Sequence, residues 1–360
     1  LQALFLTPDE PIRDVTGFQT PFFQSPTRPW FVIVPGAGKP IAVIPEIGAA
    51  LMATTWIDDI RTWASPDPVD DGVSLLADAL ADRVPDPGRI GMPMGPETGL
   101  RMPLQDFERL RDQLGGRRFQ DATEILKTAR MKKSVLEIEK IAWVCGRASD
   151  AFADLPNRVV PGLPDTEIMR RFRIDCLMRG VDAVPYLVGG AGPDGTADVI
   201  APPVGREICA GDILMLDTGC VYDGYFCDFD RNFAIGTASD AARRAYRTLH
   251  EAVDAGLSVA RPGVTCADLF HAMQNRIGAA PDSGSDVGRM GHGLGMQLTE
   301  PPSLTPFDET PLVEGMVLTL EPSMSVVPGR IMVHEENIVI REDGCTLMTT
   351  RAPSELPVVA

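Results

Sequence analysis

Apolar residues recur along the chain with two periods, and the longer period predicts the helices. Over residues 132–153 apolar side chains return every three or four positions, the spacing of a helix with one buried face. Ser134 and Glu137 stand three residues apart near the start of this segment, a spacing typical of a capping box. The same pattern predicts further helices near residues 72–83, 103–115, 165–179, 239–260 and 265–278.

Short apolar runs between turn residues predict the strands. Trp30–Val34 and Ile41–Ile44 alternate with Gly- and Pro-containing turns, so we expect a small α/β domain over residues 1–124. Strands mixed with helices that cover one side of an antiparallel sheet predict an α+β domain over residues 125–360. Its expected strands are Ile213–Leu216, Phe226–Ile235, Met316–Leu320 and Asn337–Ile340.

The net charge limits the classes of partner, and the cysteines indicate the cellular setting. The 360 residues include 33 Lys and Arg against 50 Asp and Glu, a net charge of −17, which disfavours nucleic acid and anionic membrane surfaces as partners. No apolar run approaches the roughly 18 residues of a membrane span. The seven cysteines are odd in number and show no Cys-x-x-Cys spacing, so we expect a reduced, cytoplasmic setting. The chain begins with Leu rather than Met, so we expect a natural N-terminus further upstream.

Two aspartates come from one predicted pair of strands. Asp217 follows the apolar run Ile213–Leu216 and precedes Thr218-Gly219, and Asp228 lies eleven residues later. Adjacent strands with a tight connection would bring the two carboxylates together. An Asp before Thr-Gly is, on its own, more typical of a turn.

A histidine and two glutamates complete the candidate chemistry. His292 has glycines on both sides in Gly291–Gly295, without the preceding strand and following helix of a dinucleotide loop. Glu321 ends one apolar strand and Glu335 precedes another, where carboxylates cost free energy unless they bind something. Two Asp, one His and two Glu form an oxygen-rich ligand set that suits Mn, Fe, Co or catalytic Zn.

Taken in order, these motifs resemble the creatinase/prolidase/methionine aminopeptidase family, the M24-type metallopeptidases that include Xaa-Pro dipeptidase and aminopeptidase P. The resemblance is strong over residues 125–360, and residues 1–124 resemble the creatinase N-terminal domain more loosely. The motifs that carry it are Leu216–Gly219, Tyr222–Arg231, Gly291–Gly295, Glu300–Pro302, Gly315–Pro322 and Glu335.

The resemblance implies a pita-bread fold whose C-terminal domain holds two divalent ions, with Mn expected first and Fe, Co or Zn as alternatives. It implies that Asp228 and Glu335 bridge the ions, that Asp217 serves one and that His292 with Glu321 serves the other. Four carboxylates then balance two dications. A metal-bridging water would attack the amide carbonyl of a small peptide or other small amide, and Glu321 would move the proton. A homodimer is also implied, with Trp30, Trp56 and Trp63 available to cover a partner's pocket.

Three positions depart from the family pattern. A His usual seventeen residues before the first Asp ligand is Ile200 here, and a His usual seven residues after the His ligand is Thr299. An Arg usual two residues before the last Glu ligand is Val333. We therefore expect Ile200 and Thr299 in the substrate pocket and expect Xaa-Pro dipeptides to be poor substrates.

Other polar positions near the motifs have several interpretations. Asp230 would orient a metal ligand, handle a proton or form a salt bridge with Arg231 or another cation. The glycine-rich segment Gly189–Gly195 is expected to be a loop at the pocket mouth. His334 is expected on the strand face opposite Glu335.

Three functions remain open at this point. The first is a dinuclear metal-dependent hydrolase that resembles Xaa-Pro dipeptidase and aminopeptidase P. The second is a creatinase-like C–N hydrolase, or a lyase, that acts on a small metabolite, which the loss of histidine at Ile200 and Thr299 favours. The third is a binding module without catalysis, which the intact ligand set disfavours.

Overall fold

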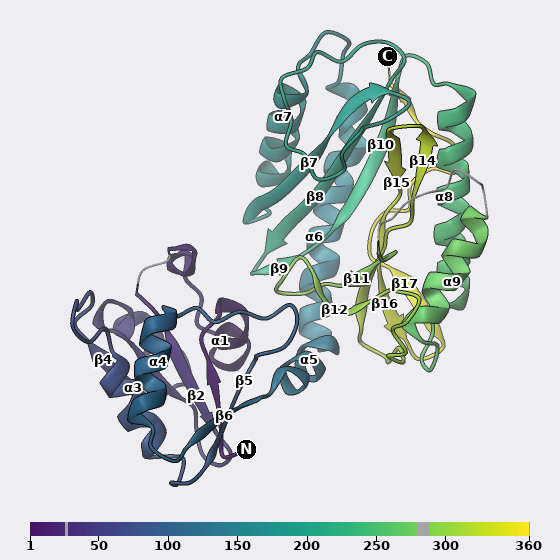
Figure 1. Ribbon diagram of the computed structural model, residues 1–360. Coiled ribbons are helices and arrows are strands. Elements are labelled where there is room, and N and C mark those ends of the chain that lie inside the picture. The colour runs from purple at the N-terminus through teal and green to yellow at the C-terminus, as the bar shows by residue number, and fades with distance from the viewer. Residues whose placement is uncertain (26–27, 279–287, 360) are drawn as a thin grey trace. The chain divides into compact units, whose positions relative to one another are not determined.

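The computed structural model describes residues 1–25, 28–278 and 288–359. The chain forms two compact units, Leu1–Ala129 and Arg130–Ala360, and helix α5 (Thr123–Met131) leads from one to the other (Figure 1). The domain boundary that we expect between residues 124 and 125 lies inside α5. Its exact position stays a prediction. No helix among the described residues has the length and apolar composition needed to cross a membrane.

The N-terminal unit is built on a six-stranded mixed sheet with the order β4-β3-β2-β1-β5-β6. Its strands are β1 (Ala3–Leu6), β2 (Phe31–Pro35), β3 (Ile41–Pro45), β4 (Asp59–Trp63), β5 (Arg89–Met92) and β6 (Arg118–Asp121). Its helices are α1 (Asp9–Thr16), η1 (Pro21–Gln24), η2 (Glu46–Gly48), α2 (Ala49–Met52), α3 (Val73–Ala81) and α4 (Leu104–Gln113).

Successive side chains of each strand point to opposite faces of this sheet, and each face has its own apolar core. Phe31 and Ile33 of β2 pack with residues of α3 and α4, whereas Val32 packs with Ile12 of α1 on the opposite face. The sheet is therefore covered on both faces, as expected of a small α/β domain.

The tryptophans of this unit mostly serve its own packing. Trp30 is buried against Phe18, and Trp63 stacks on Phe31. Trp56 is about half exposed. The expectation that Trp30 is available to cover a partner's pocket is wrong, because the aromatic core of its own unit buries it.

The C-terminal unit contains two five-stranded sheets and a two-stranded ribbon, with the orders β18-β10-β8-β7 (β9 also pairs with β8), β12-β11-β13-β16-β17 and β14-β15. The strands are β7 (Ala183–Pro193), β8 (Asp212–Tyr222), β9 (Tyr225–Phe226), β10 (Phe229–Ile235), β11 (His292–Gly293), β12 (Glu300–Ser303), β13 (Val317–Leu320), β14 (Ser323–Val327), β15 (Arg330–Val333), β16 (Glu336–Arg341), β17 (Gly344–Leu347) and β18 (Val358–Val359). The helices are α6 (Val135–Asp154), η3 (Leu155–Asn157), α7 (Asp165–Met178), α8 (Asp240–Val259) and α9 (Cys266–Ile277).

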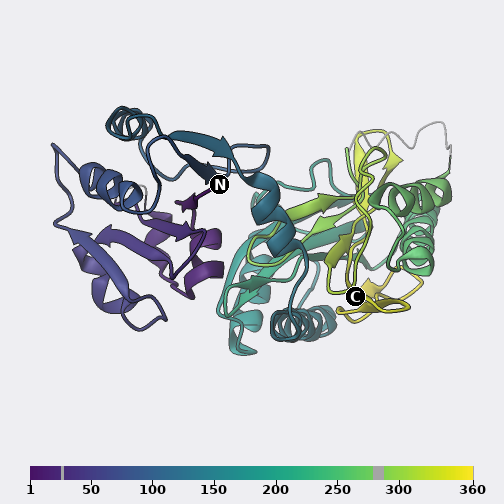
Figure 2. The same ribbon diagram turned by 90° about the horizontal axis from the view of Figure 1, so that it is seen from below.

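Each large sheet of this unit has its own helices. Helices α6 and α7 share one core with β7, β8 and β10, and α8 and α9 share a second core with β13 and β16. Helices α8 and α9 lie side by side in both ribbon views (Figures 1 and 2). The predicted capping box of Ser134 and Glu137 starts α6. The α+β prediction for this unit is confirmed.

Strand β8 is longer than predicted, because the chain does not turn at Thr218-Gly219. It continues to Tyr222, and a two-residue turn follows at Asp223-Gly224. Both turn residues have positive φ, 42° and 70°, as a type I′ hairpin turn requires. Asp217 therefore lies inside a strand rather than at its end.

The glycine-rich segment Gly189–Gly195 is mostly strand, not the expected loop. β7 runs to Pro193 and pairs with β8 along this segment. Gly189 has φ +117°, and a Cβ there would lie 2.3 Å from the Met215 carbonyl oxygen. The glycine allows the two strands to approach closely instead of ending the strand.

A buried ion pair ties the start of this unit to the segment after His292. Glu300 and Lys133 are both almost fully buried, and Lys133 Nζ lies 3.0 Å from Glu300 Oε2, while Arg130 pairs with Oε1. Burial acts to raise the pKa of Glu300, but Lys133 and Arg130 outweigh it and the pKa is lowered. A Cβ at Gly295 would lie 2.8 Å from Glu300 Oε2, so glycine makes room for the pair.

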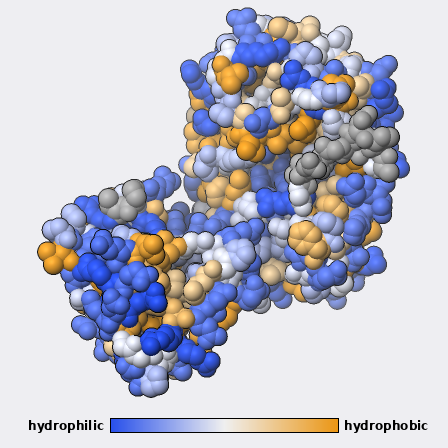
Figure 3. All heavy atoms as spheres, viewed as in Figure 1, coloured by the Kyte–Doolittle hydropathy of each residue, from blue (hydrophilic) through white to orange (hydrophobic). Residues whose placement is uncertain are grey.

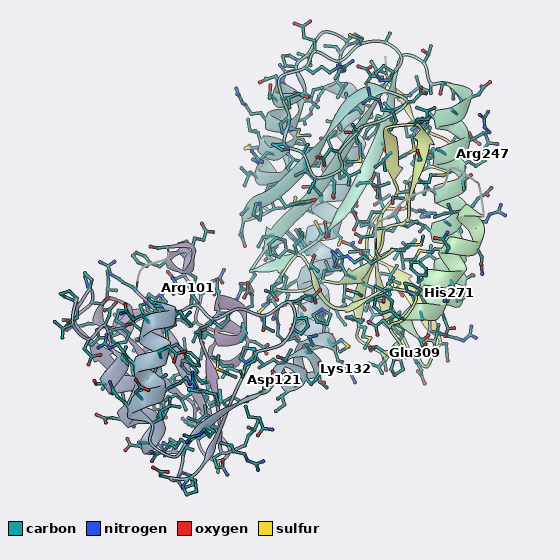
Figure 4. The ribbon with its side chains drawn as sticks, viewed as in Figure 1. Arg101, Asp121, Lys132, Arg247, His271 and Glu309 are labelled. Atoms are coloured by element: carbon teal, nitrogen blue, oxygen red, sulfur yellow. The ribbon has the colours of Figure 1, made fainter. Side chains whose placement is uncertain are left out.

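We predict that Glu300→Gln destabilises the protein by about 3–5 kcal/mol, because it leaves Lys133 buried without a counter-charge. Urea unfolding monitored on the C-terminal unit measures the loss. Glu309→Gln, at an exposed position labelled in Figure 4, is the matched control and should change the free energy of unfolding by less than about 0.5 kcal/mol. Equal stability of the two variants would contradict the prediction.

Candidate metal centre

Strand alternation places Asp217 in a cavity. Leu214 and Leu216 of β8 join the core beneath helices α6 and α7, whereas Met215 and Asp217 line a cavity of about 220 Å³ on the other face. Asp217 stands opposite Asp230 of β10 in the antiparallel register. Two carboxylates of neighbouring strands therefore share one side of the sheet.

Asp228 lies at a break between β9 and β10, where a continuous strand Phe226–Ile235 was predicted. The Asp228 backbone N–H donates to Asn337 Oδ1 at 3.0 Å, and Asn337 Nδ2 donates to the Asp228 carbonyl. The side-chain amide of Asn337 thus replaces strand pairing at this point. Since Asn337 is two residues after Glu335, the same contact ties Asp228 to Glu335.

His292 lies in the short strand β11 with its ring held from one side. Its Nδ1 lies 2.9 Å from the Gly293 carbonyl oxygen, and its backbone N–H donates to Thr319 Oγ1 at 3.1 Å. Because a carbonyl oxygen only accepts hydrogen bonds, the contact with Gly293 places a proton on Nδ1. Nε2 is then left facing two carboxylates, 3.4 Å from Asp228 Oδ2 and 3.5 Å from Glu321 Oε2.

Glu321 and Glu335 come from neighbouring strands of the second sheet. Glu321 directly follows β13, and its backbone N–H donates to the Met290 carbonyl at 3.0 Å. Glu335 directly precedes β16, which pairs with β13. Ligand oxygens of Asp217, Asp228 and Glu335 all lie within 4.8 Å of one another.

Burial and mutual repulsion make this cluster costly to ionise. Burial raises the pKa of Asp217 to about 7, and the charge of Glu321 adds to the shift. Burial, followed by neighbouring carboxylates, also raises the pKa of Asp228 and Glu335 well above ordinary values. For Glu321 burial acts in the same direction, but His292 and Arg289 outweigh it and the pKa is lowered. The cluster therefore needs positive charge at neutral pH.

The donor set fits divalent cations. Asp217 Oδ1 and Glu335 Oε1 are buried without a hydrogen-bond partner among the described residues, and His292 Nε2 faces the carboxylates. Buried polar atoms normally have partners, so oxygens left over inside a cluster of carboxylates are what a metal site requires. The arrangement can hold ions between the two sheets.

Asp230 lies beside the cluster and does not pair with Arg231. Its Oδ2 accepts a hydrogen bond of 2.6 Å from Asn232 Nδ2, and its Oδ1 has no hydrogen-bond partner in the part of the chain that the structure describes. Arg231 instead pairs with Glu336 at 2.9 Å. Burial, then the charge of Asp217, raises the pKa of Asp230. The expected salt bridge with Arg231 is wrong because Glu336 holds the guanidinium.

The three positions that depart from the family pattern all line the cavity. Ile200, Thr299 and Val333 lie around it together with the five candidate ligands and Asp230. In the space-filling view, orange apolar side chains border a hollow in the C-terminal unit (Figure 3). At these three positions the cavity is lined by two apolar side chains, Ile200 and Val333, and by the hydroxyl of Thr299.

Other histidines lie away from the cluster. His271 of α9 is exposed (Figure 4), and His250 contacts the Ala352 carbonyl. His334 is buried with its ring against Tyr246, as expected of the face opposite Glu335. None of these three lines the cavity.

Sequence reasoning missed several residues of the site. Asn337 positions Asp228, and Tyr186, Leu298 and Arg289 line the cavity. Burial, then the charges of the cluster, raises the pKa of Tyr186. Of these residues, a search for basic side chains near the ligand motifs would have found Arg289, which lies three residues before His292.

Comparisons with known proteins agree with this geometry. The family model described as Metallopeptidase family M24 matches residues 139–342, and the Creatinase/Prolidase N-terminal domain model matches residues 1–132. The predicted architecture, a creatinase-type domain before an α+β metallopeptidase domain, is confirmed.

Individual relatives cover most of the chain. The Probable dipeptidase PepE of Mycobacterium bovis is 27% identical, over 100% of this chain and 92% of the relative. The Xaa-Pro dipeptidase of Pyrococcus furiosus is 26% identical, over 67% of this chain and 70% of the relative. The crystal structure of dipeptidase PepE from Mycobacterium ulcerans matches with a TM-score of 0.86 and 28% identity, over 100% of this chain and 93% of that chain.

We predict that the gain in melting temperature on adding Mn²⁺ to chelated protein increases with pH. Groups with a raised folded-state pKa stabilise the metal-free protein below their ordinary pKa of about 4. That contribution is lost as pH rises through the folded values, about 7 for Asp217. Bound ions compensate the charge and stabilise the folded state.

Thermal melts between pH 5 and 8, with chelator and with Mn²⁺, measure this gain. In Asp217→Asn one repelling carboxylate is gone, so the metal-free protein should depend less on pH. A gain that stays constant over the range, or melts that superimpose, would contradict the electrostatic account.

Proposed function

The chain belongs to metallopeptidase family M24, and from that premise we propose that it hydrolyses small peptides at a centre of two divalent ions. The observation that carries the proposal is the buried cluster of carboxylates with unpartnered oxygens on Asp217 and Glu335. The dipeptidase names of its relatives support a substrate of two residues.

The proposed ligand arrangement follows the positions of the side chains. Atoms of Asp217, Asp228 and Glu335 lie within 4.8 Å of one another, so these three carboxylates would hold ions together, with Asp228 and Glu335 shared between two ions. His292 and Glu321, whose Nε2 and Oε2 are 3.5 Å apart, would complete the second site. The four carboxylates balance two dications, and Mn is the first candidate for both, ahead of Fe, Co and Zn.

Different residues of the chain have different roles in the proposed hydrolysis. Bound divalent ions lower the pKa of water and polarise an amide carbonyl. The lowered pKa of Glu321 keeps its carboxylate ionised. In the proposed reaction this carboxylate would accept a proton and pass it to the leaving amine. Asp230, held by Asn232, lies beside Asp217 and adds a further carboxyl group for orienting or proton transfer.

The cavity wall sets the preferred substrate. Ile200 and Val333 supply no side-chain hydrogen bond to a peptide, and the Thr299 hydroxyl is shorter than an imidazole. Loss of one donor to a developing oxyanion typically costs about 10²–10³ in rate. We therefore expect Ala-Pro and Gly-Pro to be cleaved at least about a hundredfold less efficiently than a peptide suited to this apolar wall. The missing histidines at Ile200 and Thr299 would also suit a creatinase-like reaction, but the dipeptidase names of the relatives favour a peptidase.

Assembly and location follow from weaker indications. A homodimer and a cytoplasmic setting remain predictions, the first from the family resemblance and the second from the scattered cysteines. Of the three tryptophans considered for a partner contact, Trp56 is the one with about half of its surface exposed.

We predict that the Mn-loaded protein cleaves dipeptides and that Glu335→Gln lowers kcat/KM by more than about a hundredfold. Even residues that only orient a metal ligand typically contribute 10–100-fold. A panel of dipeptides with apolar residues, Xaa-Pro dipeptides, longer Xaa-Pro peptides and small amides identifies the substrate class.

Glu314→Gln, an exposed substitution of the same kind, is the control and should retain full activity. Absence of turnover on every dipeptide would contradict the proposed function. Efficient cleavage of Ala-Pro, with kcat/KM near about 10⁴ M⁻¹s⁻¹, would contradict the expected substrate preference.

A further inference from the structure

The C-terminal unit has a second cavity, for which the proposed hydrolysis has no role. Its volume is about 300 Å³. Strand β10 contributes to both cavities, because Asp230 lines the one that holds the candidate metal ligands and Arg231 lines the second. Among the described residues the two cavities share no lining residue. The second cavity is therefore a separate space on the opposite side of β10.

Most of the wall of this second cavity is apolar and much of it is aromatic. Phe152 of α6, Phe233 of β10 and Tyr246 of α8 line it. The segment between β17 and β18 adds Pro353 and Pro357, and the Tyr246 hydroxyl donates to the Pro353 carbonyl at 2.8 Å. An apolar cavity of about 150 Å³ is already large enough to bind benzene. The second cavity thus has room for an aromatic ring with a short polar arm.

The charged side chains in this wall are all positive. Among the described residues that line the second cavity, Arg231 and Arg351 are charged and no carboxylate is present. The two guanidiniums share the buried carboxylate of Glu336, at 2.9 and 3.1 Å, and Arg351 also pairs with the half-exposed Asp254. In a chain of net charge −17, such a wall favours an anion over a cation.

Two side chains of this wall, both more than nine-tenths buried, keep an unused hydrogen-bond donor. The Nη atoms of Arg231 donate to three backbone carbonyls and to Glu336, which leaves its Nε–H without an acceptor among the described residues. Ser149 Oγ accepts from the Thr350 N–H at 3.1 Å, and its own hydrogen has no acceptor in the described part of the chain. Arg231 also donates to the Thr350 carbonyl at 2.6 Å, so both side chains lie beside Thr350.

We propose that the second cavity binds a small carboxylic acid with an aromatic body. Its carboxylate accepts hydrogen bonds from Arg231 Nε and from the Ser149 hydroxyl, and its ring packs against Phe152 and Phe233. Hydrogen bonds to an ionised group are stronger than neutral ones, and the apolar wall strengthens them further. The site does not depend on the proposed peptidase function, because none of its residues lines the metal-centre cavity.

The test compares an aromatic carboxylate with its neutral amide. Isothermal titration calorimetry of the Mn-loaded protein measures binding of phenylacetate and of phenylacetamide. We expect phenylacetate to bind with a Kd of about 1 mM or lower. We expect phenylacetamide to bind at least about tenfold more weakly, and Ser149→Ala to weaken phenylacetate binding by about tenfold, because each change removes a hydrogen bond that involves a charged group.

A cavity-filling variant identifies where phenylacetate binds. Ala153 is exposed on α6 and lines the second cavity, so Ala153→Phe should fill the space for the ring and weaken binding at least about tenfold. Ala142→Phe is the matched control, since Ala142 is also exposed on α6 and does not line the cavity. It should bind phenylacetate as the wild type does. In crystals with the para-bromo derivative, the bromine anomalous peak should lie between Phe152 and Phe233.

Each other outcome overturns the proposal. Binding that is unchanged in Ala153→Phe, or a bromine peak at the metal ions, assigns phenylacetate to the metal centre or to another site. Equal binding of the carboxylate and the amide excludes the anion as the recognised group, and undetectable binding of both by the wild type excludes the ligand class. These results stand whether or not the protein cleaves dipeptides, so failure of the peptidase function leaves this site unaffected.

Discussion

Repulsion among buried carboxylates is the constraint on which the rest of the C-terminal unit depends. Asp217, Asp228, Glu321 and Glu335 come from two sheets, yet their carboxylates meet around one cavity. Ionised together without cations they would oppose folding, and the raised pKa of Asp217, Asp228 and Glu335 expresses that cost. A fold that keeps such a cluster in place must hold the side chains rigidly and must compensate their negative charge.

The supports are hydrogen bonds and ion pairs outside the cluster. Asn337 holds the backbone of Asp228, Thr319 holds that of His292, and the Lys133–Glu300 pair fixes the segment that follows His292. Helices cover each large sheet on one side, and part of the other side carries the polar groups of the cavity. These contacts lie outside the cluster and hold its side chains in position, as a functional site requires.

Much of this arrangement was predictable from sequence because it depends on local patterns. The period of apolar residues gave the helices, and acidic residues at the ends of apolar runs marked Glu321 and Glu335. The longer β8 was missed, although Asp223-Gly224 is a strong hairpin signal. The break at Asp228 depends on Asn337, more than a hundred residues later, and no local pattern encodes such a contact. Arg289, by contrast, lies three residues before His292, so a search for basic residues beside the ligand motifs would have found it.

The central claim is that this cluster holds two ions that share Asp228 and Glu335. Anomalous diffraction from crystals of the Mn-loaded protein, collected near the manganese absorption edge, tests it most directly. The account predicts two anomalous peaks between the sheets, one beside Asp217 and one beside His292 and Glu321, with Asp228 and Glu335 in contact with both. A single peak at this place under saturating Mn²⁺, or peaks only elsewhere on the molecule, would contradict it.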